Sequence, residues 1–288
     1  MRSSRDNIPT QEIQNPSGRA FAVVVLLFSL AFVVVSLTAG EWVNENIVTP
    51  VLSIFKGEKP QPQGIISGSP NTPAVTGERQ SENIKVDART YYLLQGGIYS
   101  DITNAAASSA EIKKSGGGGY IIDEGDKKRV ILSVYLTDTD AKAIRDRLKA
   151  EANMETYVYA DNLPEFSVSV GATGEQISVI KDAFALPAYA IDNLIKISEN
   201  YDRGTDQTAD MTSLKAKAKA VKEKFVNNVL PDDKNQSLLE VLEYISLLCD
   251  KVEKLPADLT LKTPDISSEL KYSVTEMIDS YSQFIARL

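Results

Sequence analysis

The chain of 288 residues has few of the side chains that usually carry out catalysis. It contains no histidine, which removes the usual general base and the Ser-His and Cys-His nucleophile pairs. Its one cysteine, Cys249, can form no internal disulfide, and no Cys/His spacing for zinc exists. The run Gly116 to Gly119 lacks the Lys-Ser/Thr that follows a phosphate-binding loop. The sequence therefore predicts a binding protein, not an enzyme, with no catalytic residue, no metal site and no cofactor.

The overall charge limits the class of partner. A formal net charge of −8 argues against nucleic acid, because displacing phosphate counterions requires basic patches. One basic cluster exists, and it fits either a surface for anionic polymers and lipids or, more commonly, a solvated helix face. It consists of Lys215, Lys217, Lys219, Lys222 and Lys224.

An uncharged apolar stretch near the amino terminus predicts a membrane anchor. Residues 20–40 are long enough to span a hydrocarbon core of roughly 30 Å. Arg19 precedes the stretch and Glu41 follows it, which favours a cytoplasmic tail over residues 1–19 and an extracytoplasmic remainder. The alternative is a cleavable signal peptide, whose apolar region is usually about 7–15 residues. We expect a single-pass protein of the cell membrane.

Residues 41–87 are rich in proline, glycine and serine and show no sustained period of 2 or 3.6 residues. This composition predicts a flexible linker between the anchor and a folded domain.

Residues 88–162 show strand and helix patterns in alternation. Apolar and aromatic runs predict strands over 90–97, 120–123, 128–135 and 155–160, whereas capped, apolar-periodic runs predict helices over 102–114 and 137–149. The order β-α-β-β-α-β folds as an antiparallel sheet with both helices on one side. The other face of the sheet is then open.

Strand alternation places several side chains on that open face. Gln95 should share it with Tyr91 and Leu93. Arg129, Ile131 and Ser133 should lie on the same face, because the intervening Val130, Leu132 and Val134 are apolar and suit the helix-covered side. An amide and a guanidinium beside an aromatic ring suit the hydroxyl and N-acetyl groups of a sugar. The alternative is a solvated sheet face whose polar residues merely alternate with core.

Residues 89–160 resemble a sporulation-related repeat (SPOR) domain. The resemblance rests on the strand 91–100 that runs into Gln95 and glycine, an alanine-rich helix, a glycine turn, Arg129-Val130, and a second helix that opens with Thr and Asp. It implies a ferredoxin-like domain at 88–162 that binds peptidoglycan glycan strands stripped of their stem peptides, which enrich at the septum. The implied peptidoglycan-binding residues are Tyr91, Leu93, Gln95, Arg129, Ile131 and Tyr157. For Tyr157, packing in the core or at an edge is an equal alternative.

Residues 163–288 predict a C-terminal α-helical bundle. Apolar residues repeat at helical spacing over 175–200, 210–228, 236–255 and from Pro264 to the end. Pro187 predicts a kink or a break in the first of these helices. Cys249 is expected in the bundle core.

The predicted fold class is α+β, with an N-terminal transmembrane helix, a ferredoxin-like β-α-β-β-α-β domain of SPOR type and a C-terminal helical bundle. The predicted function is membrane-anchored, extracytoplasmic peptidoglycan binding at the septum in cell division or sporulation. Divisome or wall-hydrolase proteins are expected as further partners. The alternative is a non-catalytic, membrane-tethered scaffold that recruits wall-synthesis or wall-hydrolase proteins through its helical domain.

Overall fold

A computed structural model describes residues 78–229 and 236–287 of the chain. All of these residues fall within one compact unit, Pro73–Leu288. The cytoplasmic tail and transmembrane helix expected over residues 1–40 lie outside the described residues. So does most of the expected linker, of which only residues 78–87 are described.

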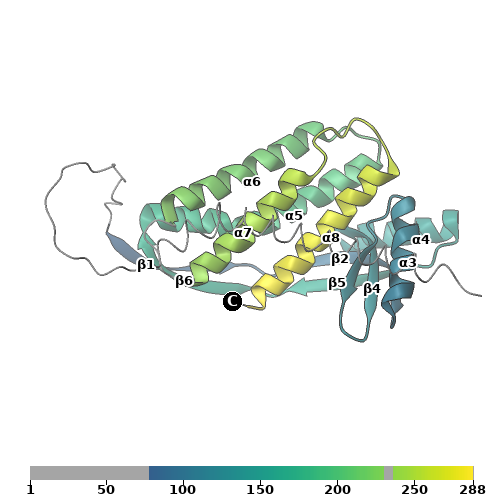
Figure 1. Ribbon diagram of the computed structural model, residues 1–288, viewed down its shortest axis with the longest axis horizontal. Helices are drawn as coiled ribbons and strands as arrows, with labels where there is room; N and C mark the ends of the chain where they lie inside the picture. Colours follow the sequence, from purple (N-terminus) through teal and green to yellow (C-terminus); the bar gives the residue numbers. More distant parts are fainter. Residues whose placement is uncertain (1–77, 230–235, 288) are drawn as a thin grey trace, which may run out of the picture. The chain divides into compact units, whose positions relative to one another are not determined.

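The described residues form six strands and six helices (Figure 1). The strands are β1 (Arg79–Val86), β2 (Arg89–Tyr99), β3 (Tyr120–Asp123), β4 (Lys128–Tyr135), β5 (Tyr157–Leu163) and β6 (Phe166–Thr173). The helices are α3 (Ile102–Lys114), α4 (Asp138–Ala152), α5 (Gly174–Asp202), α6 (Thr208–Val229), α7 (Gln236–Lys254) and α8 (Pro264–Ile285).

The antiparallel four-stranded sheet has the strand order β3-β4-β2-β5. Helices α3 and α4 begin where the sequence supplies an N-cap: Asp101 accepts hydrogen bonds from two backbone N–H groups, and Thr137 accepts one. Both helices cover the same face, where Val130 packs in a cluster with α3 and Leu94 in a cluster with α4. The element order agrees with that expected for residues 88–162.

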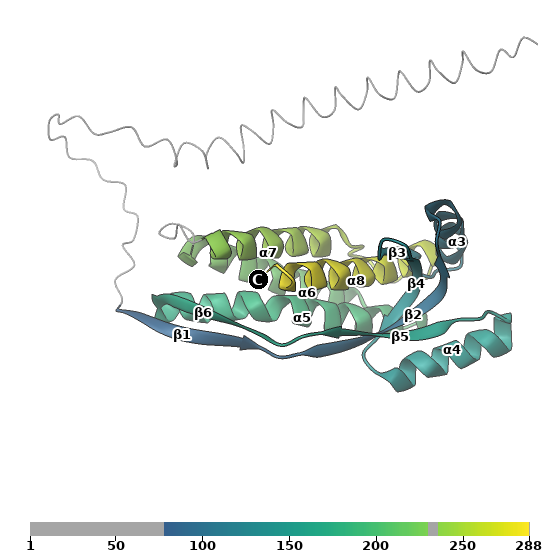
Figure 2. The same cartoon turned by 90° about the horizontal axis from the view of Figure 1, so that it is seen from below.

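Strands β2 and β5 continue into a long two-stranded extension made of β1 and β6 (Figure 2). The register is unchanged across the junction: Val86 lies opposite Phe166, and Arg89 lies opposite Leu163. Pro164 interrupts the hydrogen-bonded ladder because it has no backbone N–H to donate. Helix α5 follows β6 directly and packs along the extension.

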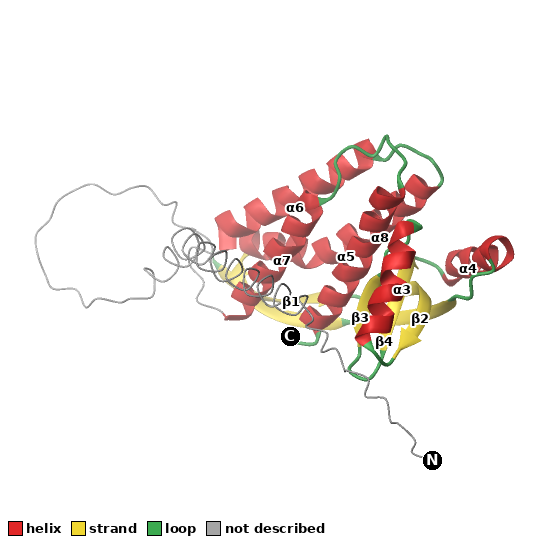
Figure 3. Cartoon of the chain, turned by 45° about the vertical axis from the view of Figure 1, so that its right-hand side comes forward, coloured by secondary structure: helices red, strands yellow, loops and turns green. Residues whose placement is uncertain are grey.

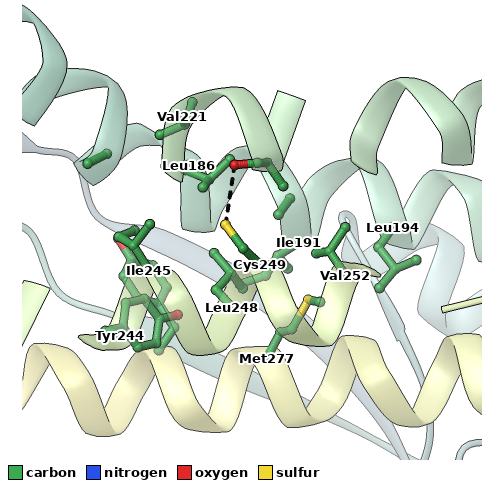
Figure 4. Packing of buried hydrophobic residues seen from close by; sticks show 14 of the residues in the cluster. Leu186, Ile191, Leu194, Val221, Tyr244, Ile245, Leu248, Cys249, Val252 and Met277 are labelled. Carbon is green, nitrogen blue, oxygen red and sulfur yellow. Dashed lines mark hydrogen bonds between the residues drawn. The ribbon is translucent and has the colours of Figure 1, made fainter. Parts of the chain in front are cut away.

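Helices α5 and α8 cover the second face of the sheet, and α6 and α7 pack against them. Leu93 and Ile131 are fully buried in one cluster with apolar residues of all four helices. Within that cluster Tyr244 of α7 stacks on Phe284 of α8 at a centroid distance of 4.3 Å. Cys249 is buried as expected, and its thiol donates to the carbonyl oxygen of Ala218 at 3.3 Å (Figure 4). Sheet and helices therefore share one core.

The predicted fold class is wrong as stated. The described chain is α+β with two small antiparallel sheets, and none of its helices within 78–229 and 236–287 is long and apolar enough to cross a membrane. The segments 88–162 and 163–288 do not form a sheet module followed by a separate bundle, because both contribute to one core. The sheet has two apolar faces, and each requires cover.

Three local expectations also change. Residues 79–86 form strand β1, although they were expected in the flexible linker, and their partner β6 was not expected at all. β6 carries a clear period-2 signal, since Phe166, Val168 and Val170 alternate with serine and glycine. Helix α5 continues through Pro187, so of the two outcomes expected there, a kink or a break, the break does not occur. Its buried apolar stripe outweighs the one backbone hydrogen bond that proline removes.

The glycine run at 116–119 lets α8 approach the sheet. A Cβ atom at Gly118 would lie 3.0 Å from the backbone of Lys271 and Tyr272. Beside it, the ammonium of Lys271 donates to the carbonyl oxygen of Gly116 at 2.8 Å and pairs with Asp202 at 2.7 Å. The run is thus a close-packing element between α3, β3 and α8.

We predict that an isolated fragment of residues 88–162 does not fold. It would expose the face that α5 and α8 cover, including Tyr91, Leu93 and Ile131, each 1 % exposed or less in the full chain. Losing the burial of a large apolar side chain costs about 1.5–3 kcal/mol, and a small domain has a stability of about 5–15 kcal/mol. Limited proteolysis of the fragment and of the full chain measures this. A protease-resistant fragment with a cooperative thermal transition would contradict the shared core.

We predict that Gly118→Ala destabilises the chain by about 1–3 kcal/mol, the usual range for overpacking, because backbone cannot yield as a flexible side chain does. Gly171→Ala on β6 is the matched control, since a Cβ there has nothing within 4 Å. The free energy of unfolding in urea provides the measurement. Equal effects of the two substitutions would rule out a close-packing role for Gly118.

Candidate functional site

Four of the six residues expected to bind glycan are buried: Gln95 is 7 % exposed at the end of the sheet, and three others lie in the core. Tyr91, Leu93 and Ile131 are 1 %, 0 % and 0 % exposed beneath the helices. The Tyr91 hydroxyl donates to Asp192 of α5 at 3.1 Å, and burial raises the pKa of Tyr91 well above its usual value. These three side chains fix the sheet to the helices and do not reach a ligand in this arrangement.

A β-bulge alters which residues of β4 share a face. Leu94 pairs with Ser133, but the next residue, Gln95, pairs with Ile131, so Leu132 is left without a partner across the ladder. The bulge turns Leu132 and Ser133 toward the same side, the one covered by α3 and α4. Ser133 therefore leaves the face that Arg129 and Ile131 occupy, contrary to the uninterrupted alternation expected from the sequence.

Gln95 and Arg129 do come together. A terminal nitrogen of Arg129 donates to Gln95 Oε1 at 3.0 Å, and Arg129 Nε donates to Glu124 at 2.8 Å. The guanidinium also lies over the ring of Tyr159 at 4.6 Å from its centroid. Three contacts therefore hold Arg129 in one position at the end of the sheet that the helices leave partly uncovered.

Aromatic and aliphatic surface surrounds this arginine. Tyr157 lies opposite Gln95, and Ile98 lies opposite Arg129, so all four side chains share a face. Tyr157 is 60 % exposed and Ile98 is 47 % exposed. We call Gln95, Ile98, Arg129, Tyr157 and Tyr159 the open end of the sheet.

The open end has hydrogen-bond donors that no contact within the described chain uses. A guanidinium carries five N–H groups, and Arg129 uses two of them on Glu124 and Gln95. The amide nitrogen of Gln95 makes no hydrogen bond with another described residue. Donors beside an exposed ring suit a ligand that presents carbonyl or hydroxyl oxygens and an apolar face.

Carboxylates that the sequence analysis did not single out border the open end. Asp161 continues the face of Tyr157 and Tyr159 along β5, and no described residue forms a hydrogen bond or ion pair with its carboxylate. Burial raises the pKa of Asp161, with nearby Asp279 and Glu124 adding to the effect. Asp279 in turn accepts a hydrogen bond from Tyr120 at 2.8 Å. The period-2 spacing of 157, 159 and 161 was the available sequence signal.

Three of the five lysines in the series on α6 make side-chain contacts within the protein. Lys215 donates to the carbonyl oxygens of Glu253 and Leu255 at the end of α7, and Lys222 pairs with Asp250 at 2.8 Å. Lys219 lies 3.9 Å from Glu223. These contacts fit a solvated helix face that also joins α6 to α7.

Comparison with protein-family models, with curated proteins and with solved structures finds no match to this chain. The resemblance to SPOR domains stays a prediction from the sequence.

We predict that Asp161→Asn stabilises the protein at neutral pH. Burial raises the pKa of the Asp161 carboxyl in the folded state. The folded protein therefore loses stability as the pH rises from the pKa of the unfolded state, near 3.9, through the pKa of the folded state. At pH 7 the substitution removes an unpaired half-buried charge, whereas at pH 3 both forms are neutral and should unfold alike. Urea midpoints at the two pH values measure this, with Asp126→Asn in the exposed turn as the control. If Asp161→Asn raised the stability at pH 3 by as much as at pH 7, the charge of Asp161 would not be the cause.

Proposed function

We propose that this chain is a non-catalytic protein that binds glycan strands of peptidoglycan at the open end of the sheet. Through the resemblance to SPOR domains, the proposal extends to septal peptidoglycan in cell division or sporulation. It depends only on the described residues and not on the segment at 20–40.

The observation that carries the proposal is the fixed position of Arg129 between Gln95, Glu124 and Tyr159. A side chain already ordered before binding loses little conformational entropy when a ligand arrives. Its free N–H groups match the N-acetyl carbonyl and hydroxyl oxygens that recur along a glycan. Glu124 offsets the positive charge of Arg129, so the remaining N–H groups of the guanidinium, rather than its net charge, would hold the oxygens of the glycan.

The exposed ring of Tyr157 supplies the second kind of contact. The C–H faces of sugars are apolar, and an aromatic ring that is 60 % exposed offers them a surface without any rearrangement of the core. Tyr157 lies opposite Gln95 across the strand pair, so a sugar on the ring would be within reach of the amide.

The site is smaller than the one expected from the sequence. Helices α5 and α8 cover the part of the face that holds Tyr91, Leu93 and Ile131, so only the end of the sheet can contact a strand. A small contact area supports weak binding by one copy. Retention on a polymeric wall would then depend on many equivalent sites along the glycan.

The test is sedimentation of the full-length chain with purified cell-wall sacculi, before and after an amidase removes the stem peptides. We predict that Tyr157→Ala weakens binding about three- to tenfold, because a ring contact contributes about 0.5–1.5 kcal/mol. Tyr189→Ala is the matched control, since Tyr189 is an exposed tyrosine on α5, 39 % exposed and outside the open end.

Binding that increases after amidase treatment and decreases only in Tyr157→Ala would support a glycan site at the open end. Absence of binding to either preparation, or equal losses in the two variants, would remove the proposal. The scaffold alternative, in which the helical surface recruits partner proteins, would then be the one to pursue.

A further inference from the structure

A cavity of about 860 Å³ lies along the carboxyl end of β4. It is bordered by α3 and α4, which stand apart on the face opposite the open end (Figure 3), and by the end of α5 and the first turns of α8, which pack on the other face. Sites for small molecules usually have volumes of roughly 300–1,000 Å³. We call this space the α3–α4 cavity. The glycan site proposed above does not involve it.

Three hydroxyl groups from buried residues line the α3–α4 cavity. Ser133, Tyr135 and Ser198 are 6 %, 7 % and 6 % exposed. Ser133 donates to the Tyr135 oxygen at 2.9 Å, which leaves the Tyr135 proton without an acceptor among the described residues. Ser198 has no hydrogen-bond partner among them. Unused hydroxyl donors at a cavity wall are positioned to donate to a ligand that accepts hydrogen bonds.

The bulge in β4 is what brings the Ser133 hydroxyl to this wall. Without it, strict alternation would turn Ser133 toward the face that holds Ile131. Bulges occur more often than average beside functional sites, where they redirect a side chain. Burial also raises the pKa of Tyr135 to about 12, so its hydroxyl remains a donor at physiological pH.

Most of the other side chains that line the α3–α4 cavity are apolar, or are charged in equal numbers of each sign. Ile112, Leu132, Ile144, Leu148 and Met154 supply the apolar surface. Four acidic and four basic side chains border the cavity, so they contribute no net charge. The most buried of the ammonium groups, that of Lys271, already pairs with Asp202 at 2.7 Å, and Arg203 lies 3.8 Å from Glu199. Lys262, an exposed residue at the border, donates to the carbonyl oxygens of Thr205 and Leu259. Because the bordering charges balance in number, the cavity suits a neutral ligand better than a charged one.

We propose that the α3–α4 cavity binds a neutral amphipathic small molecule. Its apolar body lies against Leu132, Ile144 and Leu148, and its carbonyl or hydroxyl oxygen accepts hydrogen bonds from Tyr135 and Ser198. The chain would then carry two sites on opposite faces of one sheet, one for a polymer and one for a small molecule.

The test uses Prodan, a neutral naphthalene ketone whose emission shifts to longer wavelength when its carbonyl accepts a hydrogen bond. We predict saturable binding of one Prodan per full-length chain. Tyr135→Phe keeps the shape of the cavity and removes one donor, so binding should weaken about three- to tenfold, with emission at shorter wavelength. Ala143→Trp, at an exposed position on the cavity mouth, should abolish binding.

Tyr157→Phe is the matched control, because it removes a tyrosine hydroxyl at the open end on the other face. It should leave both the affinity for Prodan and the emission wavelength unchanged. Thermal unfolding of each variant identifies any that fail to fold, and Tyr135→Phe and Ala143→Trp serve as independent tests. Absence of saturable binding, or binding that neither cavity variant alters, would overturn the proposal.

Discussion

The structure depends on burying both faces of one small sheet. Leu94 and Val130 face α3 and α4, while Leu93 and Ile131 face α5 and α8. Neither pair of helices covers the sheet alone, and an uncovered apolar face is unstable in water. The four C-terminal helices are therefore part of the same cooperative unit as the sheet. Polar contacts such as that of Tyr91 with Asp192 fix how the layers fit together.

The placement of α8 decides how much of the sheet remains accessible. The close approach permitted by Gly118 brings α8 across β3 and β4. Beyond its reach, Tyr157 is 60 % exposed, and the Arg129 side chain remains 16 % exposed. On the other face the separation of α3 from α4 leaves the cavity with Ser133 and Tyr135 on its wall. Both candidate sites thus occur where a covering helix layer is incomplete, which is where side chains can meet a ligand without disrupting the core.

Local sequence signals predicted the individual elements well. Asp101, Thr137 and Pro264 mark helix starts, and the apolar strand runs occur where the structure has β2 to β5. The joining of Gln95 with Arg129 also followed from alternation. The β-bulge in β4 did not follow from alternation, because nothing in a strand sequence marks a residue that has no partner across the ladder. Strand β1 has only Ile84 and Val86 as apolar residues, too few to distinguish it from a linker. Cover on both faces could have been inferred from the near-continuous apolar run of β4, which only Ser133 interrupts and which is typical of a strand buried on both sides.

The pairing of β1 with β6 and the packing of α8 on β4 have a consequence for synthesis of the chain. Val86 can pair with Phe166 only after Phe166 has been synthesised. Ile131 can be covered only after the helix that begins at Pro264 has been synthesised. Such long sequence separations give a high contact order. The chain must lose the entropy of loop closure before these contacts stabilise it. A nascent chain on the ribosome therefore carries an incomplete sheet with a bare apolar face until α8 has emerged.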